Sequence, residues 1–191
     1  MMQSVTRRAV LLSGLALAAC AEAGRSVSLS PQDRADVARA EAYLNGLSTL
    51  RLWFVQTWPD GGRGYGTLTY IPGNLRLDYD NPRGMTLTAG DGHLVLNNPQ
   101  TGAVTRMGLS HSPLGLLMTH PIQLSGAVTV TAIRRGPATL QMSLAKTDRL
   151  SDGLLTLRFR DDSGALTLSG LVLVDDRQHV TTLDFSESPD K

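Results

Sequence analysis

The chain has 191 residues, of which 41% are hydrophobic and 18% charged, with a formal net charge of +1. This length suits one domain that can bury a core without disulfide cross-links. A net charge so close to zero gives no electrostatic basis for nucleic-acid binding. With only 5% aromatic residues, stacking platforms for single strands are not expected either. We therefore expect no nucleic-acid partner.

The first twenty residues have the pattern of an export signal. Arg7 and Arg8 precede an apolar run over residues 9–19, and about eleven residues are too few to cross a bilayer as a helix, which needs about 20. Thr6, Arg7 and Arg8 also resemble a twin-arginine signal, so twin-arginine export and ordinary secretion both stay open. The sequence thus predicts an export signal over residues 1–20, a tether over 21–29 and one exported domain over 30–188.

Cys20 is the single cysteine of the chain, and it closes the tetrapeptide Leu17-Ala18-Ala19-Cys20. This tetrapeptide resembles the lipobox at which bacterial lipoproteins are cut and acylated, so Cys20 is a candidate lipidation site. Ordinary signal cleavage nearby, with Cys20 incidental, is the alternative. In either case the exported domain has no cysteine pair, and packing alone must stabilise it.

One amphipathic helix is predicted over residues 31–47. Ser30 is a typical N-cap, Pro31 suits the first helical position and Asp33 places an acid in the first turn. Arg39 and Glu41 are expected on the surface. The apolar positions recur at helical spacing and should lie against an apolar surface: Val37, Ala40, Leu44 and Leu47.

Short segments that alternate apolar and polar residues, separated by turn residues, fill most of the remaining chain and predict antiparallel strands. The predicted strands cover residues 54–58, 65–70, 75–79, 85–89, 93–97, 104–107, 127–132, 139–144, 154–159, 166–168, 170–174 and 180–185. About eleven strands are too many for one flat sheet, so the sheet should bend strongly. Their close spacing excludes long helical crossovers. Ser112 and Pro113 begin a continuously apolar stretch, which predicts a short helix over 113–118.

No catalytic constellation can be assembled from the sequence. The four histidines, which have no metal-ligand spacing and are expected on the surface, are His93, His111, His120 and His179. Ser112 is better explained as a helix cap, and the pairs at 161–162 and 175–176 as turn residues with local hydrogen bonds. We therefore expect a protein that is not an enzyme and has no cofactor or metal. The surplus apolar residues either fill the core or line a groove, and the strand patterns leave both open.

Several short segments follow one another in an informative order and spacing. A helix precedes Phe54-Val55-Gln56, and residues 66–68, 72–79, 90–94 and 112–117 follow, with Pro82 between them and a hairpin over 172–183 at the end. Together they resemble the LolA family, the periplasmic carriers of outer-membrane lipoproteins, over about residues 31–186. The resemblance implies an unclosed, strongly curved antiparallel β-barrel with a small helical lid.

In that family the apolar interior receives lipoprotein acyl chains by affinity, without a covalent step. The resemblance therefore implies acyl chains as ligand, an inner-membrane exporter and an outer-membrane acceptor as partners, a periplasmic location and a monomeric carrier. The side chains expected to contact acyl chains, on the strand parity that alternation suggests, are Phe54, Leu68, Tyr70, Leu75, Leu77, Tyr79, Leu87 and Leu96, with Leu114, Leu116, Leu117 and Met118 from the lid.

Two positions depart from the family pattern. Many LolA proteins have an arginine, associated with lid closure, before the proline that matches Pro72, and here that position is Ile71. We expect closure to rest on apolar packing or on another polar contact. If Cys20 is acylated, the chain resembles LolB, the anchored outer-membrane acceptor of the same fold, or combines both roles. An envelope protein that uses this fold to bind other lipids or a partner is a further alternative.

Overall fold

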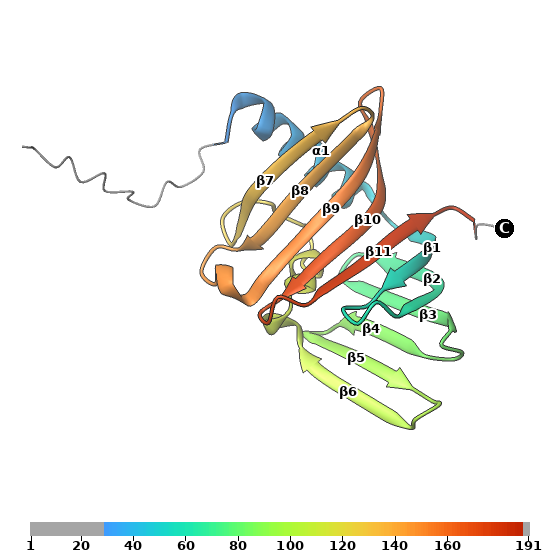
Figure 1. The fold of residues 1–191 in the computed structure, drawn as a ribbon. Helices are drawn as coiled ribbons and strands as arrows, with labels where there is room; N and C mark the ends of the chain where they lie inside the picture. Colours follow the sequence, from blue (N-terminus) through green and yellow to red (C-terminus); the bar gives the residue numbers. More distant parts are fainter. Residues whose placement is uncertain (1–28, 189–191) are drawn as a thin grey trace, which may run out of the picture.

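The computed structural model describes residues 29–188, so the predicted export signal, Cys20 and nearly all of the tether lie outside the described residues. Within residues 29–188 the chain forms one α-helix, three short 3-10 helices and eleven strands (Figure 1). The helices are α1 (Pro31–Gly46), η1 (Leu109–His111), η2 (Pro113–Leu117) and η3 (Leu150–Asp152). The strands are β1 (Leu50–Thr57), β2 (Arg63–Ile71), β3 (Asn74–Asn81), β4 (Thr86–Gly90), β5 (His93–Asn98), β6 (Ala103–Gly108), β7 (Val128–Gly136), β8 (Thr139–Lys146), β9 (Gly153–Asp162), β10 (Ala165–Asp175) and β11 (Val180–Ser186).

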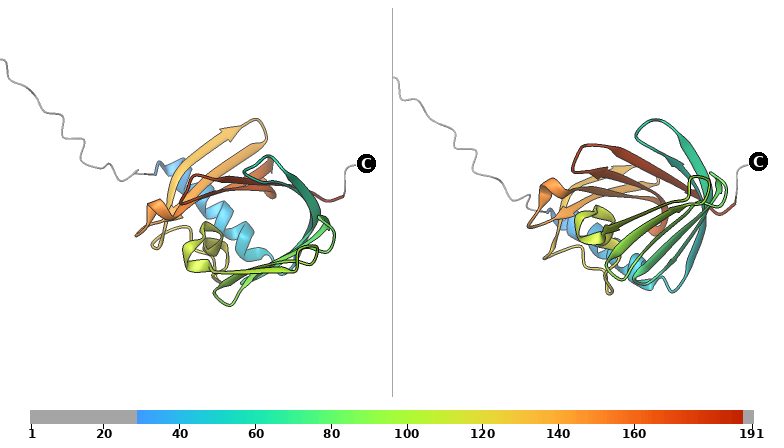
Figure 2. Two further views of the ribbon diagram at one scale, coloured as in Figure 1. Left: turned by 60° about the horizontal axis from the view of Figure 1, so that its bottom comes forward. Right: turned by 90° about the horizontal axis from the view of Figure 1, so that it is seen from below.

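All eleven strands belong to one sheet with the order β6-β5-β4-β3-β2-β1-β11-β10-β9-β8-β7. Every neighbouring pair is antiparallel, and the pairing of β1 with β11 joins the two halves of the chain. The edge strands β6 and β7 do not pair with each other, so the barrel stays open. The sheet curves around α1 and the 3-10 segment between β6 and β7 (Figure 2). The predicted fold, a curved, unclosed antiparallel β-barrel with a small helical part, is confirmed.

One strand prediction was wrong. Residues 166–168 and 170–174 form a single strand, β10, with a bulge between Leu168 and Gly170. A Cβ atom at Gly170 would lie 2.6 Å from the carbonyl oxygen of Leu183 on β11, so the glycine marks a close backbone approach and not a strand end. The bulge lets both Leu168 and Leu171 point into the core, where they are 8% and 2% exposed.

Helix α1 begins as predicted and ends at Gly46, one residue before the predicted end. The Ser30 hydroxyl accepts a hydrogen bond from the backbone N–H of Asp33, and the Asp33 carboxylate accepts one from the backbone N–H of Ser30. This capping box satisfies two backbone donors at the helix start. No helix among residues 29–188 is both long and apolar enough to cross a membrane.

A buried carboxylate that the sequence did not reveal fixes α1 on the sheet. Asp36 is 6% exposed and accepts hydrogen bonds from Arg39 at 2.8 Å and from Arg135 of β7 at 2.7 Å. Arg39, expected on the surface, also pairs with Asp161 of β9 at 2.5 Å. Buried charges need such partners, because an unpaired carboxylate in the core is costly. The network ties the helix to two distant strands.

The opposite end of α1 contacts the chain that follows η2. Asn45 donates a hydrogen bond to the carbonyl oxygen of Ile122 and accepts one from its backbone N–H, at 2.9 and 2.8 Å. Glu41, also expected on the surface, accepts a 2.5 Å hydrogen bond from the backbone N–H of Leu124. Ile122 and Leu124 are each 2% exposed, so their polar backbone needs these side-chain partners. The helix therefore positions the segment that crosses the open side of the barrel.

Replacing Asp33 by asparagine is expected to remove part of the pH dependence of folding stability. Hydrogen bonds from Arg135 and Ser30 lower the pKa of Asp33 from 3.8 to about 2. Because the folded pKa lies below the unfolded one, ionised Asp33 stabilises the fold above about pH 4, and this contribution is lost as the pH falls toward 2. Urea unfolding midpoints of the wild type and Asp33→Asn should differ near neutral pH and converge near pH 2.

The matched control is Asp176→Asn, because Asp176 is exposed and has no ion pair within the described residues. Its unfolding midpoints should follow the wild type across the same pH series. A difference between the wild type and Asp33→Asn that stays constant from neutral pH to pH 2 would contradict the role given to Asp33.

Candidate functional site

The concave face of the sheet, here called the inner face, carries a continuous apolar surface. Directly paired residues of neighbouring antiparallel strands share one face, and the pairing runs across β1 to β5 in one row: Leu52, Leu68, Leu77, Leu87 and Leu96. Tyr70, Leu75, Ala89 and Leu94 form the next row. The predicted strand positions therefore lie together on one face, toward the core.

The twelve side chains predicted to contact acyl chains are all part of the core or packed against it. Nine are buried: Phe54, Leu68, Tyr70, Leu75, Leu77, Tyr79, Leu114, Leu116 and Leu117. Leu87, Leu96 and Met118 are half-buried. The structure thus brings the set together, while its role in ligand binding stays a prediction.

Part of the inner face borders an open cavity of about 260 Å³, here called the inner cavity. Its walls come from β1, β3, β4, β5, β10, β11 and the start of η2. Four of the predicted residues line it, namely Leu75, Leu77, Leu87 and Leu114. Six further wall residues were not predicted from the sequence to contact a ligand, namely Gln56, Leu94, Leu171, Leu173, Thr181 and Leu183. The alternation that selected Leu96 also places Leu94 on this face, and that signal could have found it.

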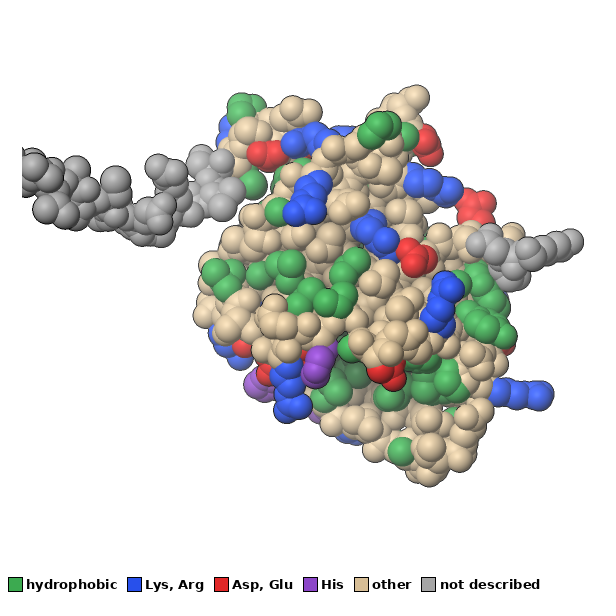
Figure 3. Space-filling view, in the orientation of Figure 1, with side chains coloured by type: hydrophobic (Ala, Val, Ile, Leu, Met, Phe, Trp, Pro, Cys, Tyr) green, Lys and Arg blue, Asp and Glu red, His purple; other side chains and the backbone are tan. Residues whose placement is uncertain are grey.

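The inner cavity opens at one end of the barrel, here called the mouth, which is formed by Pro59, Asp175, His179 and Thr181. Hydrophobic side chains are visible in the recess between the ends of β10 and β11 and the strands β5 and β6 (Figure 3). At the rim, His179 Nδ1 lies 3.0 Å from a carboxylate oxygen of Asp175. The site therefore combines a polar rim with an apolar interior, as small-molecule pockets commonly do.

The other end of the inner face is filled. Only about 20 Å³ is free where Leu44 and Leu47 near the end of α1 meet Leu68, Tyr70 and Leu117. Many of the predicted acyl-contacting side chains therefore pack against protein in this structure. The two interpretations that the sequence left open, a filled core and a groove, each hold for one part of the inner face.

Residues 109–125, here called the lid segment, lie over the open side of the sheet between β6 and β7 (Figure 2). Ser112 caps η2 as predicted, because its hydroxyl accepts a 3.2 Å hydrogen bond from the backbone N–H of Leu114. Apart from Gly115, every residue of η2 is buried. Such a helix has no face for water and stays in place only while its apolar side chains are covered.

Few polar contacts hold η1 and η2 within the lid segment, whose last part is bound to α1 through Ile122 and Leu124. Tyr70 donates a 3.4 Å hydrogen bond to the carbonyl oxygen of Leu117, and Lys146 of β8 donates one to the carbonyl oxygen of Ser110. A Cβ atom at Gly115 would lie 2.5 Å from the carbonyl oxygen of Leu109, so η1 and η2 pack closely. The lid segment is thus held by apolar packing and by polar contacts other than an arginine at position 71.

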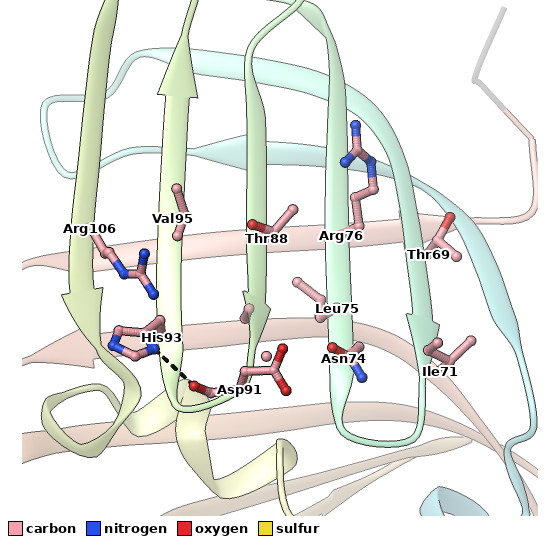
Figure 4. A pocket seen from close by; sticks show the side chains of 12 residues that line it. Thr69, Ile71, Asn74, Leu75, Arg76, Thr88, Asp91, His93, Val95 and Arg106 are labelled. Carbon is pink, nitrogen blue, oxygen red and sulfur yellow. Dashed lines mark hydrogen bonds between the residues drawn. The ribbon is translucent and has the colours of Figure 1, made fainter.

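Ile71 lies on the opposite, outer face of the sheet and is 45% exposed. It borders an outer groove with Asn74, Arg76, His93 and Arg106 (Figure 4). This hollow of about 430 Å³ is larger than the inner cavity, but it is more open to solvent and three charged side chains line it, Arg76, Asp91 and Arg106. The inner cavity is therefore the better candidate for an apolar ligand.

Four histidines and two aspartate pairs are the titratable side chains that the sequence singled out, and all of them lie within residues 29–188. All four histidines are exposed, as expected, and no group of three potential metal ligands occurs there. Asp175 accepts hydrogen bonds from the backbone N–H groups of Arg177 and His179, which confirms its turn role. The turn prediction for residues 161–162 was wrong, because both lie in β9 and Asp161 pairs with Arg39.

An open antiparallel barrel with an apolar concave face, a covering helix and a partly filled cavity defines a LolA-like fold. The chain belongs to the LolA family: the family model "Outer membrane lipoprotein carrier protein LolA" matches residues 45–190. The resemblance that the sequence suggested is thereby confirmed.

Two solved structures are similar to the chain at low identity. An uncharacterized conserved protein from Thermus thermophilus is 9% identical, with 83% of this chain and 90% of that chain covered and a TM-score of 0.43. A LolA superfamily protein from Nitrosomonas europaea is 12% identical, with 83% and 94% covered and a TM-score of 0.40. Comparison with curated protein sequences finds no match.

Replacing Gly115 by alanine is expected to loosen the lid segment. The added methyl group would force η1 and η2 apart, and overpacking of this kind costs about 1–3 kcal/mol. Amide hydrogen exchange over residues 109–125 should become faster, and an environment-sensitive hydrophobic dye should bind more strongly.

Gly46→Ala is the matched control, since a Cβ atom there meets nothing within 4 Å. It should leave exchange over residues 109–125 unchanged. Wild-type exchange rates in Gly115→Ala would show that close packing of η1 on η2 does not hold the lid segment.

Proposed function

We propose that this protein binds the acyl chains of lipoproteins in the inner cavity and carries them across the periplasm to the outer membrane. The observation that carries the proposal is an apolar cavity on the inner face of a LolA-family fold, covered by an apolar 3-10 helix with few polar contacts. Transfer then depends on relative affinity and requires no covalent step.

The size of the inner cavity supports a moving lid. Its volume of about 260 Å³ lies below the roughly 300–1,000 Å³ of typical ligand pockets. Leu114 borders this cavity and Leu117 borders the filled end, while Leu75 and Leu171 border both. Movement of η2 would therefore join the two spaces into one longer groove along the inner face.

The free energy lost when η2 moves and the free energy gained when an acyl chain is buried are of similar size. Exposing each buried leucine of η2 costs about 1.5–3 kcal/mol, and burying each CH₂ of an acyl chain returns about 0.8 kcal/mol. Part of one acyl chain can thus offset displacement of three leucines, Leu114, Leu116 and Leu117. Cargo release would be favoured when the lid segment returns, so its packing sets the affinity.

Replacing Leu87 by tryptophan is expected to weaken acyl-chain binding. Leu87 is half-buried and lines the inner cavity, so the larger ring would occupy space meant for the ligand. Affinity for a fluorescent long-chain fatty acid should fall about tenfold, which corresponds to about 1.4 kcal/mol. Fluorescence titration of the purified protein measures this change.

The matched control is Thr88→Trp, which adds a ring at the next residue of β4 but on the outer face. It should bind the fatty acid as the wild type does. Equal losses in both variants would place the ligand elsewhere. Lipoproteins that co-purify with the wild type and are lost in Leu87→Trp would separate a lipoprotein carrier from a protein that binds other envelope lipids.

Ile71→Arg is expected to slow ligand release. The β2–β3 turn adjoins the lid segment, because a Cβ atom at Gly73 would lie 3.7 Å from the carbonyl oxygen of Met118. A guanidinium offers five N–H donors, so an arginine beside this turn would add hydrogen-bonding capacity near the lid segment that isoleucine lacks. Stopped-flow release of the fluorescent fatty acid tests this, with Ile71→Met as the uncharged control, and equal release rates for all three proteins would count against lid control at this position.

The lipobox-like position of Cys20 supports a second candidate function, in which the protein is anchored to the membrane by acyl groups. The tetrapeptide that ends at Cys20 resembles a lipobox, and an acylated protein would be an anchored, LolB-like acceptor or would combine carrier and acceptor. The intact mass and membrane fraction of the protein from its native envelope separate the forms. Acyl groups on Cys20 in the outer-membrane fraction mean an anchored protein, and a soluble processed chain means a diffusing periplasmic carrier.

The proposed partners follow from the proposed route. A carrier needs an inner-membrane exporter to load the inner cavity and an outer-membrane acceptor to receive the cargo. The carrier is proposed to act as a monomer.

A further inference from the structure

Gln56 is a buried residue whose amide side chain belongs to the wall of the inner cavity. It lies near the end of β1, where it pairs with Leu183 of β11 and Gly64 of β2, and it is 6% exposed. Within residues 29–188 the only other buried polar side chain is Asp36, which has two arginine partners. Gln56 instead faces the inner cavity among leucines.

Tyr79 determines which end of the Gln56 amide remains free. The Tyr79 hydroxyl donates a 2.6 Å hydrogen bond to Gln56 Oε1, and burial raises the pKa of Tyr79, so the hydroxyl keeps its proton. The Phe54 ring meets Tyr79 edge-on at 5.0 Å, and the Trp58 ring stacks on it at 6.2 Å. The tyrosine ring is thus held in place, and so is the amide.

The Nε2 group of Gln56 therefore has two N–H donors and, in the described part of the chain, no protein acceptor. Gln56 Nε2 is not one of the fully buried polar atoms that lack a partner, so the amide nitrogen borders the open space of the inner cavity, where a ligand acceptor can meet it. An acyl chain offers no acceptor along its hydrocarbon, but the ester that links it to glycerol offers a carbonyl oxygen. The ester carbonyl oxygen of the ligand can therefore serve as the hydrogen-bond acceptor that Gln56 Nε2 does not have in the described part of the chain.

We propose that Gln56 Nε2 donates a hydrogen bond to the acyl ester carbonyl of the bound lipid and so selects ester-linked chains and fixes their depth. The inference rests on the proposed function, because it requires an acyl chain in the inner cavity. Gln56 pairs with Leu183 of β11, and Thr181 lies two residues nearer to His179 and the β10–β11 turn, while Leu77, Leu87 and Leu94 belong to other parts of the same cavity wall. An ester held at Gln56 directs the chain toward these leucines and the head group toward Thr181 and His179.

The test compares two synthetic lipopeptides with equal chain lengths. One carries a diacylglyceryl group with ester links on its cysteine, and the other a dialkylglyceryl group with ether links, which has no carbonyl. The wild type should bind the ester about tenfold more tightly, which corresponds to about 1.4 kcal/mol. Isothermal titration in the same detergent gives both affinities.

Gln56→Glu removes the N–H donors but keeps the shape and the acceptor for Tyr79, and Gln56→Met removes all polar atoms at similar length. Both variants should bind ester and ether equally, and circular dichroism with thermal melting confirms that each is folded. Leu87→Trp is the control, because it should weaken both lipopeptides by the same factor.

Infrared spectra of a lipopeptide with ¹³C-labelled ester carbonyls give a second measurement. The carbonyl stretching frequency reports a hydrogen bond to the ester and should not change when only packing is lost. The bound carbonyl stretch should lie at lower frequency in the wild type than in Gln56→Glu and Gln56→Met. A wild type that binds ester and ether equally, or a carbonyl frequency unchanged in the variants, overturns the inference.

If the proposed function itself is wrong, neither lipopeptide binds to the wild type. This outcome differs from equal binding of both lipopeptides, which would contradict only the role of Gln56. A phosphatidylglycerol with the same acyl chains distinguishes the sources of the ester. Tighter binding of the lipopeptide supports recognition of a lipoprotein ester, and tighter binding of the phospholipid supports the same Gln56 contact with a membrane lipid.

Discussion

The rest of the structure depends on one constraint, which is that a single eleven-stranded sheet presents one large apolar face and never closes on it. The edge strands β6 and β7 remain apart, so the sheet cannot cover its own interior as a closed barrel does. Helix α1 and the lid segment must supply the cover. Where they pack closely the inner face is a core, and where they do not it borders the inner cavity.

The two covering elements are attached in different ways. Helix α1 is fixed by the ion pairs of Asp36 with Arg135 of β7 and of Arg39 with Asp161 of β9, which are strands far along the sequence. In the lid segment, η1 and η2 rest mainly on leucine packing and a small number of hydrogen bonds to backbone carbonyls, while Ile122 and Leu124 are hydrogen-bonded to Asn45 and Glu41 of α1. Ion pairs with a buried member resist separation, whereas apolar contacts can be replaced by another apolar surface of similar area. Acyl chains, the proposed ligand, would be such a surface, so η2 and not α1 is suited to move aside for them.

The polar and apolar groups of the inner cavity follow one another in a fixed order from the mouth inward. Polar groups stand at the mouth, Gln56 follows on the wall, and leucines line the interior. A ligand with a polar head, an ester and a hydrocarbon chain has the same order of chemistry. This match joins the proposed carrier function to the proposed role of Gln56, although each is tested separately.

The sequence by itself determined the local structure: the capping box at Ser30, ten of the strands, the Ser112 cap and the parity of the apolar residues on β1 to β5, because alternation and capping act within a few residues. Only the tertiary structure decided what these elements meet. Asp36 and Arg135 are 99 residues apart, Gln56 and Tyr79 face each other across β2, and the β10 bulge depends on the backbone of β11. No local pattern encodes such contacts, and for the same reason the division of the inner face into core and cavity could not be predicted.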